Sequence, residues 1–129
     1  MEQEQLIKQL FLTEALKFSQ PNQPFWYTSG SFGPYYLNTH FLFGGQERAE
    51  AFLTELERAR SYPEGMPSRL QRMIDIEIQS NPAFKDLIDR LLRLVLPLDF
   101  DLISGGERRD LYFSIPLATA LQLKHVTIL

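Results

Sequence analysis

Apolar residues recur at helical spacing along the first half of the chain, with polar residues between them. The pattern predicts a helix over residues 3–19, whose first turn is acidic and whose last turn carries Lys17, as the helix dipole favours. Pro21 marks its end. A second helix is predicted over residues 46–60, directly after Gly44-Gly45. Its inner face is formed by Ala49, Phe52, Leu53 and Leu56.

Residues 67–96 are predicted to form a helical hairpin. Ser68 followed by Gln71 indicates a capping box at its start, and Asn81-Pro82 is typical of a cap and first turn in its middle. Residues 73–79 also alternate as a strand would, but the strong helix formers around them favour a helix. One face of the second helix carries Phe84, Leu87, Ile88, Leu91, Leu92 and Val95.

Two aromatic-rich runs, Phe25–Thr28 and Tyr35–Asn38, flank a turn-forming segment and predict a hairpin or a pair of short strands. Packing in the core is the ordinary role of such aromatic residues. The alternative is that Thr28, Ser29 and Gly30 form a loop that faces a ligand with hydroxyl groups and closely approachable backbone.

The last third of the chain has the order strand, loop, helix, strand. We expect a strand over Asp99–Ile103, a loop over residues 104–107, a helix over residues 109–123 and a strand over His125–Leu129. This is the βαβ unit of a parallel sheet, so the predicted fold class is α/β, a short parallel sheet with flanking helices. Doubly wound domains of this kind continue for more strands, so we expect the chain to be truncated.

Composition narrows the class of protein. A chain of 129 residues is long enough for one domain and one hydrophobic core. The net charge of −3 argues against sequence-independent nucleic-acid binding, and the lack of cysteine excludes disulfides and thiolate chemistry. The N-terminus is not that of a signal peptide, and no apolar run is long enough to span a membrane. We therefore expect a soluble, cytoplasmic protein without a membrane partner.

The strongest candidate site follows the first strand of the βαβ unit. It comprises a double glycine and a charged helix start: Ser104, Gly105, Gly106, Glu107, Arg108, Arg109 and Asp110. Glycines after a strand let an anion approach the backbone, and arginines suit phosphate or carboxylate, so a small anionic ligand with a phosphate or pyrophosphate group is expected. The alternative is that these charges only cap and solvate a helix.

Other chemistries have little support. His40 and His125 are the only histidines and neither has a neighbour at ligand spacing, so we expect no metal site and place both on the surface or in loops. The serine-hydrolase elbow and the common nucleotide-binding fingerprints are missing, and no catalytic residue can be assigned.

Two regions together resemble a known family. Ser29-Gly30 with Pro34–Asn38, and Ala15–Phe18 before them, are similar to the N-terminal signature of orotate phosphoribosyltransferases. Phe100–Gly105, followed by Ile115–Ala118, resembles that family's strand, pyrophosphate loop and helix. The resemblance implies the N-terminal part of a type I phosphoribosyltransferase-like domain over residues 1–129, with 61–97 as a helical insertion.

The resemblance also implies a function. Family members transfer ribose 5-phosphate from phosphoribosyl pyrophosphate, with Mg²⁺ on the pyrophosphate, to a nitrogenous base. Thr28–Gly30 would face the base or pyrophosphate, and Ser104–Gly106 would hold pyrophosphate oxygens. Thr28 stands where the family has a ligand-contacting lysine, the lysine of the pyrophosphate loop is absent, and the family's phosphoribosyl-pyrophosphate motif would lie downstream.

We therefore expect this chain to be inactive alone and its parent to be a transferase. A non-catalytic binding or regulatory domain with the same fold is the first alternative. A structural domain that self-associates is the second, because a two-stranded sheet leaves an open edge and favours a homodimer.

Overall fold

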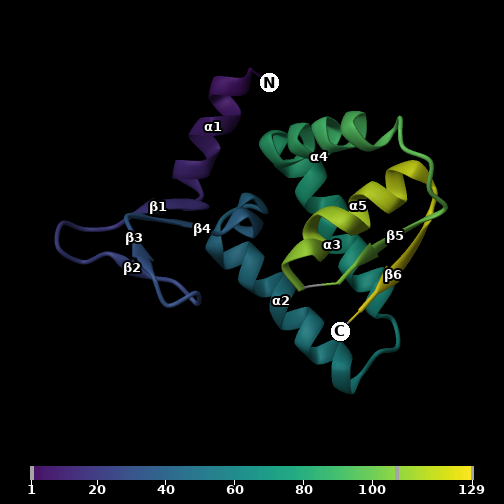
Figure 1. The fold of residues 1–129 in the computed structure, drawn as a ribbon. Helices are drawn as coiled ribbons and strands as arrows, with labels where there is room; N and C mark the ends of the chain where they lie inside the picture. Colours follow the sequence, from purple (N-terminus) through teal and green to yellow (C-terminus); the bar gives the residue numbers. More distant parts are fainter. Residues whose placement is uncertain (1, 107, 129) are drawn as a thin grey trace.

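A computed structural model describes residues 2–106 and 108–128. Helices dominate the fold. Figure 1 shows most of them gathered beside a short parallel sheet, with a small β region and the first helix on the opposite side. The helices and 3₁₀ turns are α1 (Gln3–Leu12), η1 (Thr39–Leu42), α2 (Gln46–Ser61), α3 (Met66–Ser80), α4 (Pro82–Val95), η2 (Arg108–Asp110) and α5 (Leu111–Leu121). The strands are β1 (Leu16–Phe18), β2 (Phe25–Trp26), β3 (Phe32–Gly33), β4 (Tyr35–Leu37), β5 (Leu102–Gly105) and β6 (Lys124–Thr127).

The helical hairpin is confirmed, including residues 73–79 as helix. Asn81 caps α4 as expected, because its side-chain oxygen accepts a hydrogen bond from the Phe84 amide at 3.1 Å. The capping box at Ser68 is wrong. Helix α3 begins at Met66, after Gly65 in the left-handed conformation, so Ser68 lies inside the helix.

The C-terminal βαβ unit is also confirmed. Strands β5 and β6 pair in parallel, from Leu102 opposite Lys124 to Gly105 opposite Thr127, and α5 packs against both. Strand β5 starts and ends later than expected and includes Ser104 and Gly105, so the first part of the predicted loop is strand. Leu129, the predicted end of the last strand, lies outside the described residues.

The N-terminal predictions need two corrections. The first helix ends at Leu12, and Leu16–Phe18 forms β1, which pairs antiparallel with β4. Phe25 and Trp26 pair with Phe32 and Gly33 and not with the Tyr35–Asn38 run. Short aromatic runs fit several pairings equally well, and their partners are set by contacts between distant segments that local periodicity does not report.

An aromatic cluster lies at the centre of the fold. The ring centroid of Tyr112 on α5 lies 4.4 Å from that of Phe52 on α2 and 5.1 Å from that of Phe43. Phe43 in turn meets Phe84 of α4 edge-on, with ring centroids 5.1 Å apart. All four rings are almost completely buried. Aromatic pairs in these arrangements stabilise the fold beyond the burial of their apolar surface. This cluster therefore holds α2, α4 and α5 against Phe43, which lies shortly before α2.

The predicted insertion, 61–97, is part of this core. Leu70 and Ile74 of α3 and Phe84 and Ile88 of α4 are buried in the same cluster of apolar side chains as the aromatic rings. Whatever its origin, this segment cannot be removed without exposing the centre of the fold. No helix in the described part of the chain combines the length and apolar character that crossing a membrane requires.

Candidate functional site

The predicted anion loop lies at the carboxyl end of β5, where the chain turns into η2 and then α5. Gly105 is buried, whereas Ser104, Gly106, Arg109 and Asp110 are exposed and Arg108 is half-buried. Glu107 lies outside the described residues. The arrangement of strand, glycine turn and helix start thus presents backbone and cationic side chains to solvent at one end of the sheet.

The two glycines of this loop have different surroundings. A Cβ on Gly105 would lie 2.7 Å from Ser114 Oγ and still closer to Leu111 Cδ2, so only glycine lets β5 pack this tightly on α5. A Cβ on Gly106 would meet open space. Gly105 therefore serves packing, while the backbone around Gly106 remains accessible.

A hydrogen-bonded chain of polar side chains lies under Gly105. Ser114 Oγ lies 2.9 Å from His125 Nε2, and His125 Nδ1 lies 2.9 Å from Thr127 Oγ1. Burial lowers the pKa of His125, which favours the neutral ring. The prediction that both histidines lie on the surface or in loops is wrong: His125 is a partly buried residue of β6, and His40 is buried against the rings of Phe41 and Tyr112.

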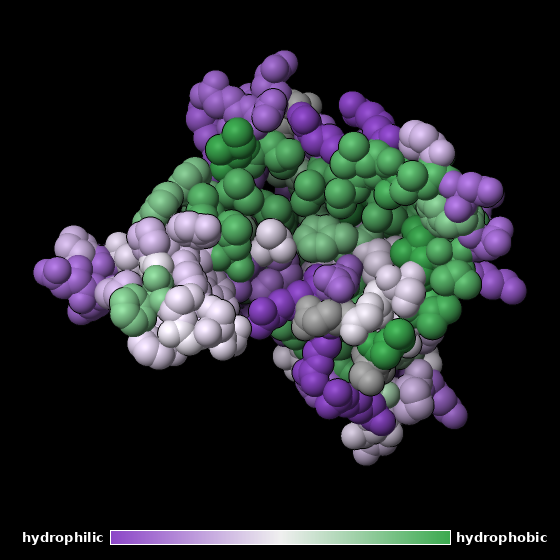
Figure 2. Space-filling model, viewed as in Figure 1, coloured by the Kyte–Doolittle hydropathy of each residue, from purple (hydrophilic) through white to green (hydrophobic). Residues whose placement is uncertain are grey.

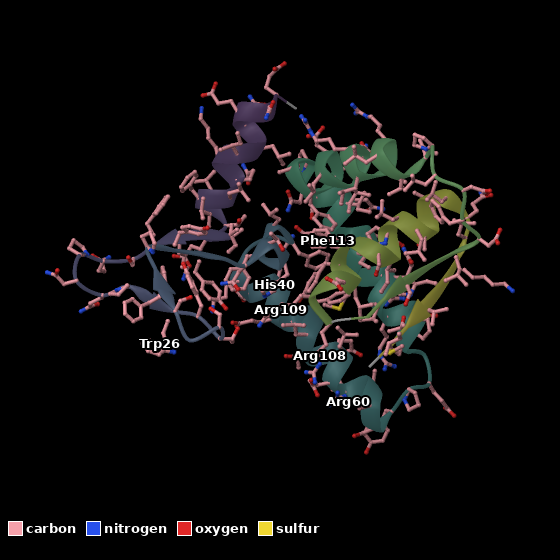
Figure 3. The ribbon with its side chains drawn as sticks, viewed as in Figure 1. Trp26, His40, Arg60, Arg108, Arg109 and Phe113 are labelled. Atoms are coloured by element: carbon pink, nitrogen blue, oxygen red, sulfur yellow. The ribbon has the colours of Figure 1, made fainter. Side chains whose placement is uncertain are left out.

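One loop arginine, Arg108, contacts helix α2. Arg108 forms an ion pair with Glu57, and the same carboxylate lies 3.8 Å from the guanidinium of Arg60. Figure 3 shows Arg108 and Arg60 beside α2, with Arg109 nearby. Sequence reasoning missed Glu57 and Arg60, because nothing in the local pattern of α2 distinguishes them from its other exposed charges.

The second predicted site forms the turn between β2 and β3. Thr28, Ser29 and Gly30 are all exposed there, and Ser29 Oγ lies 2.8 Å from Ser31 Oγ. Gly30 has φ +84° and its amide donates to the Tyr27 carbonyl, so the turn itself requires a glycine at this position.

The two predicted sites belong to different parts of the fold. Turn η2 has its main contacts with α2 and α5, whereas those of β2 and β3 are with each other. In Figure 1 the pair of strands β2 and β3 lies on one side of α2 and the β5–β6 sheet on the other. The structure groups Ser104–Gly106 with Arg108–Asp110, and keeps Thr28–Gly30 together in a separate turn.

Two comparisons with known proteins bear on the family to which this chain is related. No protein-family model matches the chain. A segment of 44 residues is 50% identical to an adenine phosphoribosyltransferase of Caldicellulosiruptor saccharolyticus; it covers 34% of this chain and 25% of that protein. The chain thus spans about a quarter of the length of the curated relative that it matches. The match supports a relationship between this chain and the type I phosphoribosyltransferases.

Proposed function

We propose that residues 104–110 bind the pyrophosphate group of a phosphoribosyl donor. The observation that carries this proposal is the placement of a double glycine and two arginines at the carboxyl end of a parallel strand, where a helix begins. Ligands of open α/β sheets bind at this end of the strands, and backbone N–H groups at a helix start favour anions. The 44-residue match to a phosphoribosyltransferase supports the same ligand class.

The glycines and the arginines of the loop have different parts in this proposal. The exposed backbone around Gly106 lets phosphate oxygens approach, because no side chain stands in the way. Arg108 and Arg109 supply fork-shaped donors that can bind phosphate oxygens in pairs. The packing of Gly105 on α5 fixes the position at which the loop begins, so this end needs little ordering when the anion binds.

The activity proposed for the whole protein is the transfer of ribose 5-phosphate from phosphoribosyl pyrophosphate to a nitrogenous base. The sequence resemblance favours orotate as the base, whereas the matched relative is named for adenine. In this proposal Thr28, Ser29 and Gly30 face the base from the β2–β3 turn. Assays with both bases separate the two substrates.

Mg²⁺ would accompany the pyrophosphate group. The described residues gather no group of three or more acidic or histidine side chains that could hold a metal ion. In this proposal the metal is carried mainly by phosphate oxygens, and Asp110, exposed beside the arginines, is the described carboxylate nearest to them in the chain. Magnesium would neutralise phosphate charge there.

A second candidate function is a binding or regulatory domain that has kept the fold without the transfer reaction. Thr28 in place of a lysine favours it, because a threonine cannot supply the positive charge that the family uses. This function predicts ligand binding by the full-length protein without turnover.

Self-association is proposed as a further property. Leu102, Val126 and Ile128 on or beside the two-stranded sheet are about half exposed. Figure 2 shows apolar residues gathered over this side of the molecule. A second copy of the chain would cover them, and light scattering should then give the mass of a dimer; the mass of a monomer at high concentration would contradict this property.

Calorimetric titration tests the pyrophosphate site. Pyrophosphate with Mg²⁺ should bind the wild-type chain, and Arg108→Ala/Arg109→Ala should weaken binding about tenfold or more, since hydrogen bonds to charged groups are involved. Arg72→Ala/Arg93→Ala is the matched control, because it removes two exposed arginines of α3 and α4. Equal affinity of the two double variants would contradict the proposal.

A further inference from the structure

One carboxylate of α2 receives arginines from two different elements. Glu57 pairs with Arg108 from η2 through one oxygen, and its other oxygen lies 3.8 Å from Arg60, three residues further along α2. The three side chains are 40–50% exposed. A compact cluster with two positive charges and one negative charge therefore lies at the edge of the proposed anion loop.

The fold brings this cluster to the loop. Turn η2 packs against both α2 and α5, so the helix that carries Glu57 and Arg60 runs past the start of α5. Figure 3 shows Arg108 and Arg60 lying close to one another along α2. Gly106 lies two residues before η2, and a Cβ at its position would meet open space.

The ion pair occupies donors that an anion would need. Arg108 meets Glu57 through Nη1, one of the N–H groups with which an arginine binds phosphate. Because the pair is half exposed, solvent weakens it, and a ligand with more negative charge can replace the carboxylate. A ligand with a single negative charge has little advantage over the Glu57 carboxylate in the competition for Arg108.

We propose that Glu57 is an internal competitor for the anion site, and that Arg60 is a further cation of that site. In the free protein Glu57 holds Arg108 and Arg60. When a polyanion binds, both guanidiniums turn from the carboxylate to phosphate oxygens. Glu57 thus makes the site selective for polyanions such as pyrophosphate over ligands of lower charge. This inference rests on the proposed pyrophosphate site.

The test compares Glu57→Gln with wild type in calorimetric titrations with inorganic pyrophosphate and, separately, inorganic phosphate. Loss of the competing charge should strengthen pyrophosphate binding about two- to fivefold, the range expected from an exposed ion pair. Phosphate binding should strengthen by a larger factor, so the preference for pyrophosphate falls. The difference should shrink as the salt concentration rises.

Glu50→Gln is the matched control. It removes the same charge from an exposed position of the same helix, where Glu50 accepts a hydrogen bond from Gln46. It should leave pyrophosphate affinity close to that of wild type. An equal gain in Glu50→Gln and Glu57→Gln would mean that net charge alone is responsible, and would overturn the inference.

Arg60→Ala gives an independent measurement, because it leaves the pair of Glu57 and Arg108 in place. It should weaken pyrophosphate binding, and unchanged affinity would overturn the assignment of Arg60. Circular dichroism shows whether each variant is folded.

The failures can be told apart. If wild type binds pyrophosphate and Glu57→Gln binds it equally or more weakly, Glu57 is not a competitor, but the proposed pyrophosphate site remains supported. Absence of binding in wild type and Glu57→Gln alike overturns both. Binding only after the substitution supports both.

Discussion

Ser114 on α5 and His125 on β6 are joined by a 2.9 Å contact between Ser114 Oγ and His125 Nε2, directly beneath the end of β5. The contact ties the helix to the sheet under the proposed anion loop. Thr127 holds the other ring nitrogen of the same histidine. The two hydroxyl groups, one on α5 and one on β6, thus fix the orientation of the His125 ring.

The stability of the protein should depend on this histidine as the pH changes. Burial lowers the pKa of His125 in the folded state below its ordinary value, so the unfolded chain binds more protons in that range. The contribution of His125 is therefore fully present above the unfolded pKa and is lost as the pH falls towards the folded pKa. The pH dependence of the free energy of unfolding is measured by urea titration of wild type and His125→Asn at pH 7.5 and at lower pH.

Carboxylates titrate at low pH in both proteins, so the comparison isolates the histidine. Wild type should lose more stability on acidification than His125→Asn. Parallel losses would show that His125 does not contribute to the pH dependence.

The close approach of β5 to α5 should make Gly105 intolerant of substitution. Gly105→Ala places a Cβ against Ser114 Oγ and Leu111 Cδ2, and should destabilise the fold by about 1–3 kcal/mol through overpacking. Gly106→Ala is the control, because its Cβ would meet open space, and should change stability by less than about 0.5 kcal/mol. Similar unfolding free energies for the two variants would contradict this close packing of β5 on α5.

The Tyr112 hydroxyl on α5 donates to the Ala49 carbonyl on α2, within the aromatic cluster. Tyr112→Phe keeps the ring and removes this bond, so it should lower the free energy of unfolding by about 0.5–1.5 kcal/mol. Tyr112→Ala should cost about 3–5 kcal/mol because it empties the centre of the core. Tyr62→Phe, at a position that is 75% exposed, should have almost no effect in the same urea titration.

The buried carboxylate of Glu77 depends on one arginine. Glu77 on α3 is almost fully buried, and it accepts from Arg48 Nη1 at 2.6 Å and from Asn81 Nδ2 at 2.7 Å. Arg48→Ala would leave the Glu77 carboxylate without a cationic partner and should destabilise the fold by about 3–5 kcal/mol.

Arg58→Ala removes an exposed arginine from Glu55, which still pairs with Arg69, and should cost no more than about 1 kcal/mol. Equal losses for the two arginine variants in chemical unfolding would show that burial of Glu77 does not matter.

Features with strong local signals could be predicted from the sequence. The hairpin of α3 and α4 has a continuous apolar face and a cap at Asn81, and the βαβ unit has two apolar runs on either side of a helix. Local periodicity and capping chemistry determine these elements, so they follow from neighbouring residues alone.

Features that depend on distant partners could not be predicted. Leu16–Phe18 extends the helical pattern of α1, yet it forms a strand because Tyr35–Leu37 supplies its hydrogen-bonding edge. Glu57 joins the candidate site only because α2 packs against η2. His125 has no sequence neighbour that indicates its contact with Ser114. Each of these pairings is a property of tertiary packing.

Binding of pyrophosphate by residues 104–110 is tested most directly by a ¹⁵N NMR titration of the full chain with pyrophosphate and Mg²⁺. The largest shifts should fall on the amides of Gly105, Gly106 and Arg108–Asp110, and Arg108→Ala/Arg109→Ala should strongly reduce them at the same ligand concentration. Shifts confined to other parts of the chain, or unchanged in that variant, would contradict it.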